Sequence, residues 1–201
     1  MPLPKLPPVG GETTGRNALD VIAEQHRELL GLCAQLTADG ADPRRHRRIA
    51  DVVVASLSRH LSAEEQYLYP AVRAVVPGGD VLADRELAED HDLLVLLKRF
   101  DATRRDESAS RALAADIAAA VRRHVETDER ELFPVLRRMA PIEDLIRVGN
   151  RIETAEEAAP TRPHPSTPAR PPWNKLVDPA VAVVDKLRDV AGRRTTYPQD
   201  L

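Results

Sequence analysis

The sequence is poor in cysteine and in aromatic residues. Cys33 is the single cysteine among 201 residues, so the chain cannot form an internal disulfide, and a metal site in it has to use nitrogen and oxygen ligands. Aromatic residues make up only 3% of the chain. The core is therefore expected to consist mainly of Leu, Val, Ile and Ala side chains.

Long apolar runs and concentrations of one charge are also missing. No stretch approaches the roughly 20 apolar residues of a membrane span, and the N-terminal segment MPLPKLPPVGGE lacks the apolar run of a signal peptide. Acidic and basic residues are interspersed, and the formal net charge is −3. We therefore expect a cytoplasmic protein that has no nucleic-acid partner and does not associate with a membrane.

Two motifs occur twice along the chain. HLSAEEQYLYP at residues 60–70 returns as HVETDERELFP at residues 124–134. AEQHRELL around His26 returns as AEDHDLLV around His91. The copies are separated by 64 residues for the first motif and 65 for the second. We therefore interpret residues 17–139 as a duplicated helical hairpin.

Four helices are expected in this repeated part. Apolar residues recur at intervals of three and four, and Asp42 followed by Pro43 is typical of a helix N-terminus. The connections are short, at residues 39–42, 77–80 and 105–108. Short connections favour antiparallel neighbours, which predicts an all-α, up-down four-helix bundle. We expect Pro70 and Pro134 to kink or end the second and fourth helices.

The bundle is flanked by extensions of different character. Residues 1–16 are expected to be a flexible arm, 140–159 an additional helix, 160–172 a proline-rich linker, and 173–201 an amphipathic segment. The apolar residues that recur at helical intervals in the last segment are Val177, Val181, Val184, Leu187 and Val190. This helix either docks on the domain or binds a protein partner through residues 173–191.

Polar residues lie on the apolar stripes of the expected helices. Positions i and i+4 share a helix face, so His60 pairs with Glu64, and His124 with Asp128. The first and third helices place histidines on their stripes as well, His26 on the first and His91, with Leu87, Leu94 and Val95, on the third. Burying so many unpaired polar groups is costly, and a bound cation offsets that cost.

The donor types restrict the metal. Imidazole and carboxylate without thiolate suit iron, manganese or zinc, and two carboxylates between four histidines suit a bridged pair of ions. The alternative is a hydrogen-bonded polar network in a metal-free bundle.

In combination, these motifs resemble the hemerythrin-like, HHE cation-binding family of four-helix bundles. The resemblance covers about residues 17–139 and rests on a histidine on the first and third helices, H-x-x-x-E-E before L-Y-P on the second, and H-x-x-x-[DE]-E before L-F-P on the fourth. It implies a non-haem centre of two iron ions. The implied terminal ligands are His26, His60, His91 and His124, and the implied bridging carboxylates are Glu64 and Asp128, with Glu65 and Glu129 in reserve.

The resemblance also implies a reaction class. Oxygen-carrying hemerythrins have a fifth histidine where this chain has Val95, so we expect a protein that reacts with or senses O2, hydrogen peroxide or nitric oxide, with catalase- or peroxidase-like turnover included. The alternative is an iron- or oxygen-sensing binding module whose C-terminal segment engages a partner without turnover. No flavin, haem or nucleotide motif is present, so electrons have to come from a separate, unknown reductant.

Two further residues are expected one turn beyond the carboxylates. Tyr67 and Glu131 take the next inward positions on the second and fourth helices and should face each other. Tyr67 could donate a hydrogen bond or ligate iron, and Glu131 could be a third carboxylate ligand or a proton shuttle. A purely structural Tyr–Glu hydrogen bond is the alternative.

Overall fold

The computed structural model describes residues 12–38, 42–103, 107–167, 173–192 and 194–201. Residues 1–11 of the expected N-terminal arm and 168–172 of the expected linker lie outside these ranges. Within them all regular structure is helical and no strand occurs. The prediction of an all-α bundle is therefore confirmed.

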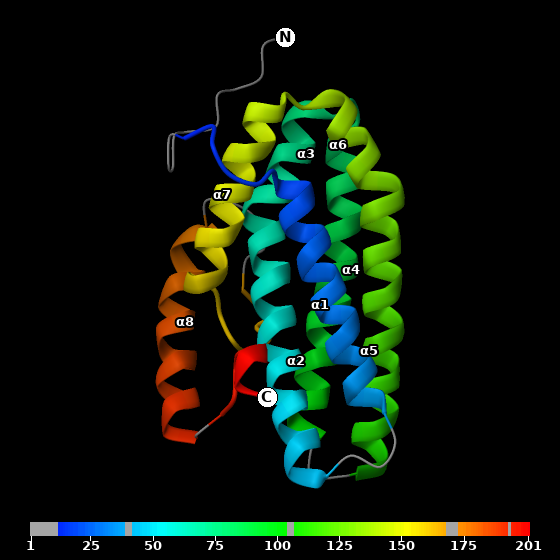
Figure 1. The fold of residues 1–201 in the computed structure, drawn as a ribbon, viewed down its shortest axis with the longest axis vertical. Coiled ribbons are helices and arrows are strands. Elements are labelled where there is room, and N and C mark those ends of the chain that lie inside the picture. Colours follow the sequence, from blue (N-terminus) through cyan, green and yellow to red (C-terminus); the bar gives the residue numbers. More distant parts are fainter. Residues whose placement is uncertain (1–11, 39–41, 104–106, 168–172, 193) are drawn as a thin grey trace.

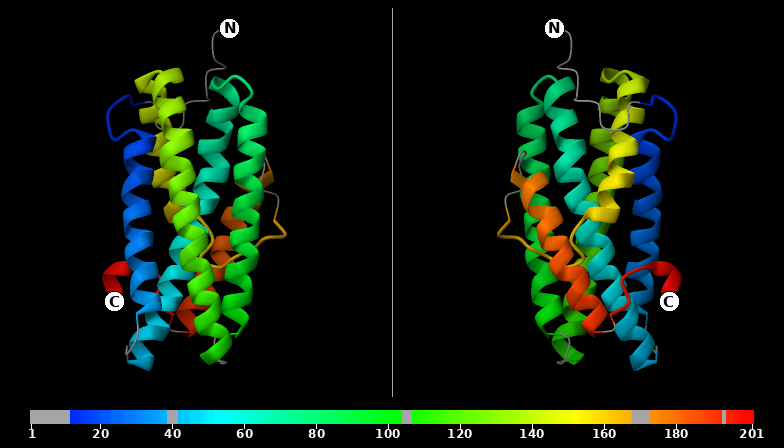
Figure 2. Two further views of the ribbon diagram at one scale, coloured as in Figure 1. Left: turned by 90° about the vertical axis from the view of Figure 1, so that its right-hand side faces the viewer. Right: turned by 90° about the vertical axis from the view of Figure 1, so that its left-hand side faces the viewer.

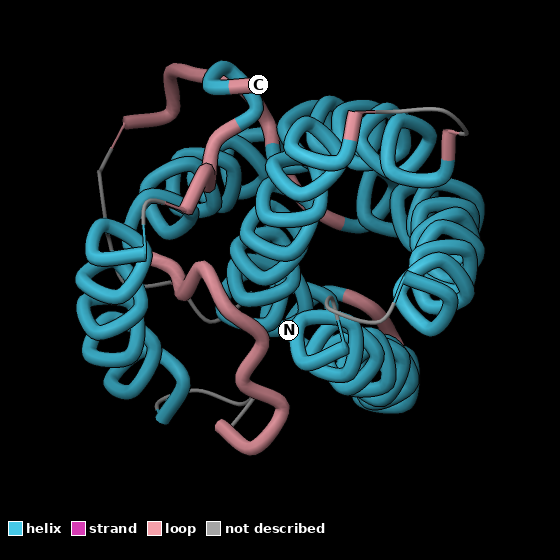
Figure 3. The backbone as a smooth tube through the Cα atoms, turned by 90° about the horizontal axis from the view of Figure 1, so that it is seen from below, coloured by secondary structure: helices cyan, strands magenta, loops and turns pink. Residues whose placement is uncertain are grey.

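Four helical rods form the up-down bundle (Figure 1). They are α1 (Ala18–Thr37); α2 (Pro43–Ala63) with the π-helix η1 (Glu64–Leu68) and α3 (Tyr69–Val75); α4 (Gly79–Thr103); and α5 (Glu107–Thr127) with the π-helix η2 (Asp128–Leu132) and α6 (Phe133–Met139). Two further helices, α7 (Ile142–Ala158) and α8 (Trp173–Gly192), and a 3-10 turn, η3 (Pro198–Asp200), follow. Seen along its axis, the bundle has these later elements outside it (Figure 3).

Local sequence explains where the first two rods begin. The Asn17 side chain accepts hydrogen bonds from the backbone N–H groups of Leu19 and Asp20 at the start of α1. Asp42 accepts one from the Arg45 backbone N–H, with Pro43 at the first helical position of α2. The predicted cap at Asp42 is confirmed.

Of the two outcomes expected at Pro70 and Pro134, a kink or an end, the structure shows that the second and fourth rods do not end but continue past both prolines. A five-residue π-turn precedes each proline, in which the residue after the turn donates its backbone N–H five residues back, from Tyr69 to Glu64 and from Phe133 to Asp128. Because proline has no N–H to donate, its missing hydrogen bond falls beside this wide turn. The helix survives, but every later side chain is rotated relative to an unbroken α-helix.

A polar layer divides the core into two apolar clusters. One cluster uses the residues of α1, α2, α4 and α5 near the connections at 39–41 and 104–106, and it includes Leu57, Leu97 and Phe100. The other joins the first turns of α1 to α3, α6 and α7. The buried members of the repeated motifs, His26, His60, Glu64, His124 and Asp128, lie between the two clusters.

The C-terminal helix packs against the bundle with its acidic face. α8 contacts α7 and η1, and it buries Asp178, Asp185 and Asp189. Of the apolar residues that recur at helical intervals, Val184, Leu187 and Val190 are exposed. None of the helices in the described ranges is both long and apolar enough to span a membrane.

Candidate metal centre

Three histidines from three helices converge in the polar layer. His26 of α1, His60 of α2 and His124 of α5 are 0%, 1% and 3% exposed. Their ring centroids lie 5.1 to 5.5 Å apart, and the Nε2 atoms of His60 and His124 are 3.2 Å apart. Burial and the neighbouring His124 lower the pKa of His26 to about 3. Near neutral pH the His26 imidazole is therefore uncharged and keeps a lone pair for a metal.

Glu64 connects these histidines through both of its oxygens. Its Oε2 lies 3.4 Å from His60 Nε2 and 3.3 Å from His124 Nε2, while its Oε1 lies 4.0 Å from His26 Nε2. Neighbouring ligands around an ion with bonds of about 2.0–2.2 Å are roughly 3.0–3.5 Å apart. The His60, His124 and Glu64 donor atoms already have the spacing of one face of a coordination shell.

Asp128 adds a second carboxylate to the same space. Its Oδ2 lies 3.9 Å from the Nε2 atoms of both His26 and His124, and the residue is fully buried. Neither Asp128 oxygen has a hydrogen-bond partner, and Glu64 Oε1 and His26 Nε2 lack one too. Buried polar atoms normally have a hydrogen-bond partner, so these four atoms without one are suited to bind a cation between them.

Burial makes the metal-free cluster electrostatically unfavourable. Desolvation, together with the Glu86 carboxylate, raises the pKa of Glu64 to about 8, and desolvation with Glu64 raises the pKa of Asp128 well above its usual range. No arginine or lysine pairs with either carboxylate among the ion pairs of the described residues. A positive ion would remove this cost by stabilising both ionised forms.

Each histidine also has an oxygen behind it. His26 Nδ1 is hydrogen-bonded to Glu129 Oε1 at 3.1 Å and His60 Nδ1 to Gln25 Oε1 at 3.0 Å, while His124 Nδ1 lies at ion-pair distance, 3.4 Å, from Asp90 Oδ1. A hydrogen bond from Nδ1 to an oxygen fixes the tautomer that leaves Nε2 free for a metal. Glu129, the reserve ligand, thus lies behind His26 and not in the centre.

The sequence contains a signal for two of these orienting residues that the motif comparison missed. Gln25 and Asp90 each directly precede the histidine of the AEQH and AEDH copies. Gln25 orients His60, and Asp90 occupies the equivalent place beside His124. The duplication therefore preserves a pairing between helices and not only the histidines.

The expected inward stripe of α4 is wrong by one residue. His91 and Val95 are exposed, Leu87 and Leu94 are only half-buried, and the carboxylate of Asp90 points into the bundle instead. The side chains that α4 buries follow a spacing of three and four, at Ala83, Glu86, Asp90, Leu93, Leu97 and Phe100. Burying Leu93, Leu97 and Phe100 together fixes this rotation. His91 is the one expected ligand that the structure does not bring to the cluster.

The expected pair of Tyr67 and Glu131 is not at the site either. Tyr67 is half-buried near Arg151, while Glu131 is exposed and accepts a 2.8 Å hydrogen bond from Arg85. Since the π-turns shift the register to five residues, Tyr69 and Phe133 take the inward positions. The Tyr69 hydroxyl donates to Asp90 Oδ2 at 2.7 Å and lies 3.5 Å from Glu64 Oε2.

The other aromatic side chain at these positions packs on a histidine. The Phe133 ring stacks on His26, with centroids 5.9 Å apart and planes inclined by 5°. Glu65, the other reserve ligand, is not among the residues whose donor atoms lie within 4.8 Å of one another, and burial and Asp178 of α8 raise its pKa to about 8. Neither Phe133 nor Glu65 offers a donor to the cluster.

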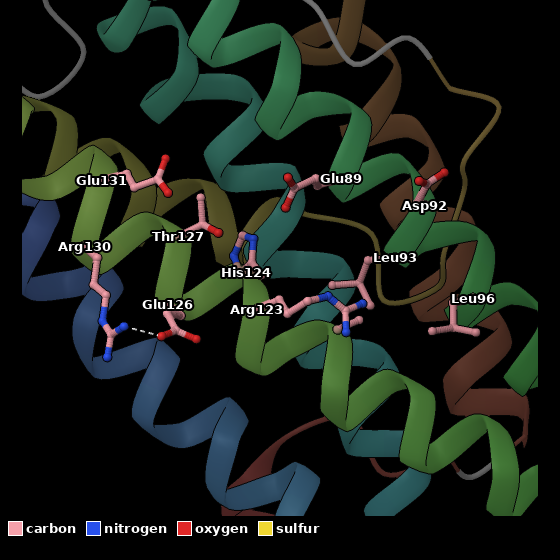
Figure 4. Close-up of a pocket in the computed structure, with 11 residues that line it drawn as sticks. Glu89, Asp92, Leu93, Leu96, Arg123, His124, Glu126, Thr127, Arg130 and Glu131 are labelled. Carbon is pink, nitrogen blue, oxygen red and sulfur yellow. Dashed lines mark ion pairs between the residues drawn. The ribbon is translucent and has the colours of Figure 1, made fainter.

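A groove between α4 and α5 reaches the cluster from outside (Figure 4). Its cavity volume is about 520 Å³, and His124 forms part of its wall. Arg123 and Arg130 line it together with Glu89, Asp92, Glu126 and Glu131. His124 thus links the buried cluster to a polar surface groove.

The C-terminal extension contacts the ligand-bearing helix from its other side. Asp178 of α8 accepts hydrogen bonds from Ser62 Oγ at 2.7 Å and from Gln66 Nε2 at 2.9 Å. These two residues flank Glu64 in the chain. Next to His60, the Arg59 guanidinium donates to the Thr196 carbonyl at 2.6 Å and lies 4.6 Å above the Tyr197 ring. Residues 173–201 therefore help to position α2 and η1.

Fold and site together define a class: a four-helix bundle with a buried imidazole and carboxylate cluster suited to a cation. A family model for the hemerythrin HHE cation-binding domain matches residues 17–136. The chain therefore belongs to the hemerythrin HHE cation-binding family.

One relative supports this assignment. The chain is 25% identical over 138 residues to an uncharacterized hemerythrin-like protein of Schizosaccharomyces pombe, and the match covers 68% of each chain. No solved structure matches significantly.

Proposed function

We propose that the protein holds a non-haem centre of two iron ions and reacts with or senses O2, hydrogen peroxide or nitric oxide. The observation that supports this most directly is the convergence of His26, His60, His124 and Glu64, whose donor atoms all lie within 4.8 Å of one another. Asp128, with both oxygens unpartnered, completes the donor set. Nitrogen and carboxylate donors without thiolate suit iron, and Cys33 lies in the apolar cluster.

The buried charge supports a count of two ions. Glu64, Asp90 and Asp128 are fully buried without an arginine or lysine partner among the described residues, whereas Glu86 is paired with Arg85. One divalent ion would leave one of three negative charges uncompensated, and two would cover all three. In this proposal Glu64 would hold the centre through both carboxylate oxygens, because Oε2 faces His60 and His124 and Oε1 faces His26.

The side chains around the centre have different roles in this proposal. An iron pair would supply redox chemistry toward O2, peroxide or nitric oxide. Gln25, Asp90 and Glu129 keep the three Nε2 atoms directed inward, and the apolar clusters exclude water. Burial and Asp90 raise the pKa of Tyr69 well above its usual range, so its hydroxyl stays protonated and acts as a donor. The groove at His124 leads toward the centre for a small ligand and for a reductant.

Metal analysis and spectroscopy test this proposal. The purified protein, reconstituted anaerobically with ferrous iron, is expected to retain about two ions per chain and to develop near-ultraviolet and visible charge-transfer bands after exposure to O2 or peroxide. Retention of zinc with no retention of iron would contradict the choice of metal. A protein that binds no cation would overturn the whole proposal.

A sensing module without turnover is a second candidate. It is favoured by the contacts of Asp178 with Ser62 and Gln66, which join α8 to the segment carrying Glu64. A change at the centre would then reach the C-terminal helix. Catalytic consumption of peroxide or nitric oxide by the iron-loaded protein distinguishes the two candidates, since a sensor shows only saturable binding.

Tyr69 and Tyr67 provide a matched pair of variants. Tyr69→Phe is expected to keep the metal but to change the visible spectrum or the rate of reaction with peroxide, because Asp90 Oδ2 and Glu64 Oε2 lose a hydroxyl donor. Tyr67→Phe, which lies on the Arg151 side, should match the wild type in both measurements. The reverse result would show that Tyr67 is the functional tyrosine.

A further inference from the structure

α8 is bound to the rest of the chain by its acidic face. Asp185 is fully buried and accepts hydrogen bonds from the Arg162 backbone N–H at 3.1 Å and from His164 Nε2 at 2.9 Å. Asp189 pairs with Arg162 at 2.8 Å and with Arg194 at 3.3 Å. Together with the Asp178 contacts, these bonds fix the rotation of the helix about its own axis.

This rotation leaves the apolar face of α8 in solvent. Val183, Val184, Leu187 and Val190 are 60%, 47%, 68% and 79% exposed. A surface helix normally buries its apolar stripe and exposes its carboxylates, and α8 does the opposite. Exposing four aliphatic side chains on one face is unfavourable unless another surface covers them.

The spacing on this face is that of a helix-packing seam. Val183, Leu187 and Val190 are separated by four and then three residues, and in the sequence Ala180 and Leu176 continue the alternation. Such a pattern places apolar side chains where a second helix can interlock with them. Valine and leucine without an aromatic residue among the described side chains of this face suit helix packing better than a lipid surface, where aromatic anchors are favoured.

The charges on the two sides of the seam differ. The acidic residues described on α8 are docked, and its exposed charged residues among those described are Lys186, on the side of α7, and Arg188, on the opposite side of the seam. The neighbouring α7 exposes Glu153 and Glu157, and Lys186 Nζ donates to the Glu157 carbonyl. α7 and α8 lie side by side on one face of the molecule (Figure 2, right). A face with an apolar seam, an acidic side and a basic side can complement itself after a two-fold rotation.

We propose that this face is the interface of a homodimer, in which the Val183, Leu187 and Val190 seam of one chain packs against the same seam of a second copy. The edge of each α8 that carries Arg188 then meets the acidic α7 of the partner. Four side chains supply less than the roughly 800 Å² per partner of a standard interface, so the dimer forms in a concentration-dependent manner. The dimer is independent of the metal proposed above.

Sedimentation velocity of the full chain between about 5 and 200 µM tests the interface. The wild type is expected to shift from monomer to dimer over this range, while Leu187→Glu and Val190→Glu remain monomeric with unchanged helix content. Val81→Glu is the matched control, because Val81 is a 78% exposed valine on α4, and it should dimerise like the wild type.

Three results would overturn the proposal. They are a wild type that stays monomeric at every concentration, a dimer that persists in both α8 variants, and a dimer that Val81→Glu also abolishes. A lipid surface is tested separately by flotation with phosphatidylcholine vesicles containing phosphatidylglycerol. Flotation that depends on Val190, with no dimer in solution, would assign the face to a membrane instead.

Discussion

Replacing Glu64 by glutamine is expected to remove most of the metal from the purified protein. Among the ion pairs of the described residues, Glu64 is the carboxylate whose oxygens face all three clustered histidines. An amide replaces the anionic donor by a neutral group and presents N–H protons toward the ions, which weakens binding strongly. Metal content is expected to fall from about two ions per chain to below about half an ion, as measured by mass spectrometry of the elements after gel filtration.

Glu65→Gln is the control for this substitution. Glu65 is the next residue, is also buried, and also has a pKa raised to about 8, but its neighbouring charge is Asp178 of α8 and it is not part of the histidine and Glu64 group. It should therefore keep the full metal content. Equal metal retention in both variants would show that Glu64 is not a ligand.

Glu64→Gln is expected to stabilise the metal-free fold, although it weakens metal binding. Because the folded pKa of Glu64 is raised to about 8 from an unfolded value near 4.3, its contribution to stability is fully present below the unfolded pKa and is lost as the pH rises through 5 to 8. Metal-free Glu64→Gln removes this penalty, so it should melt several degrees above the metal-free wild type at pH 8 and at a similar temperature at pH 4.5. Thermal unfolding after chelation measures both.

Much of the centre could be predicted because an α-helix fixes the i to i+4 relation. His60 with Glu64 and His124 with Asp128 are pairs of this kind, and the structure brings all four into one layer. His26 joins them because the apolar stripe of α1 is unambiguous. In these helices the sequence period and the buried face agree, so local pattern was sufficient.

The other site residues depend on how each helix is rotated about its own axis, and the local sequence pattern does not determine that rotation. α4 carries apolar residues on adjacent stripes, and only packing of Leu93, Leu97 and Phe100 against the other helices selects the face that includes Asp90. The π-turns have no strong sequence signal apart from the two prolines, yet each moves the inward position from i+3 to i+5 relative to the carboxylate. That shift replaced Tyr67 with Tyr69.

The face by which the C-terminal helix packs could not be predicted, for a related reason. Its apolar periodicity was correct, but the direction in which that face points is set by long-range ion pairs of Asp185 and Asp189 with Arg162, His164 and Arg194. These residues lie in the proline-rich segment and near the C-terminus, where composition suggests a linker. Pairing between such segments cannot be derived from either one alone.

Asp90→Ala is expected to weaken metal binding much more than His91→Ala, because the rotation of α4 turns Asp90 and not His91 into the bundle. Asp90 is fully buried, accepts the Tyr69 hydroxyl at 2.7 Å and lies 3.4 Å from His124 Nδ1. Removing a carboxylate that orients a ligating histidine typically weakens metal affinity about 10- to 100-fold. His91 is exposed, so His91→Ala should keep affinity within about twofold of the wild type.

Competition with a coloured chelator measures both affinities, and the melting temperature of each metal-free variant shows whether it folds. Asp90→Asn serves as a milder variant, since the amide keeps the shape and one acceptor oxygen, and it should fall between Asp90→Ala and the wild type. If His91→Ala instead loses one of two ions while Asp90→Ala loses none, α4 presents its histidine to the centre. His91 would then be the terminal ligand that the family resemblance implies. Removing a terminal ligand releases an ion, whereas removing an orienting carboxylate weakens affinity without changing the number of ions that can bind.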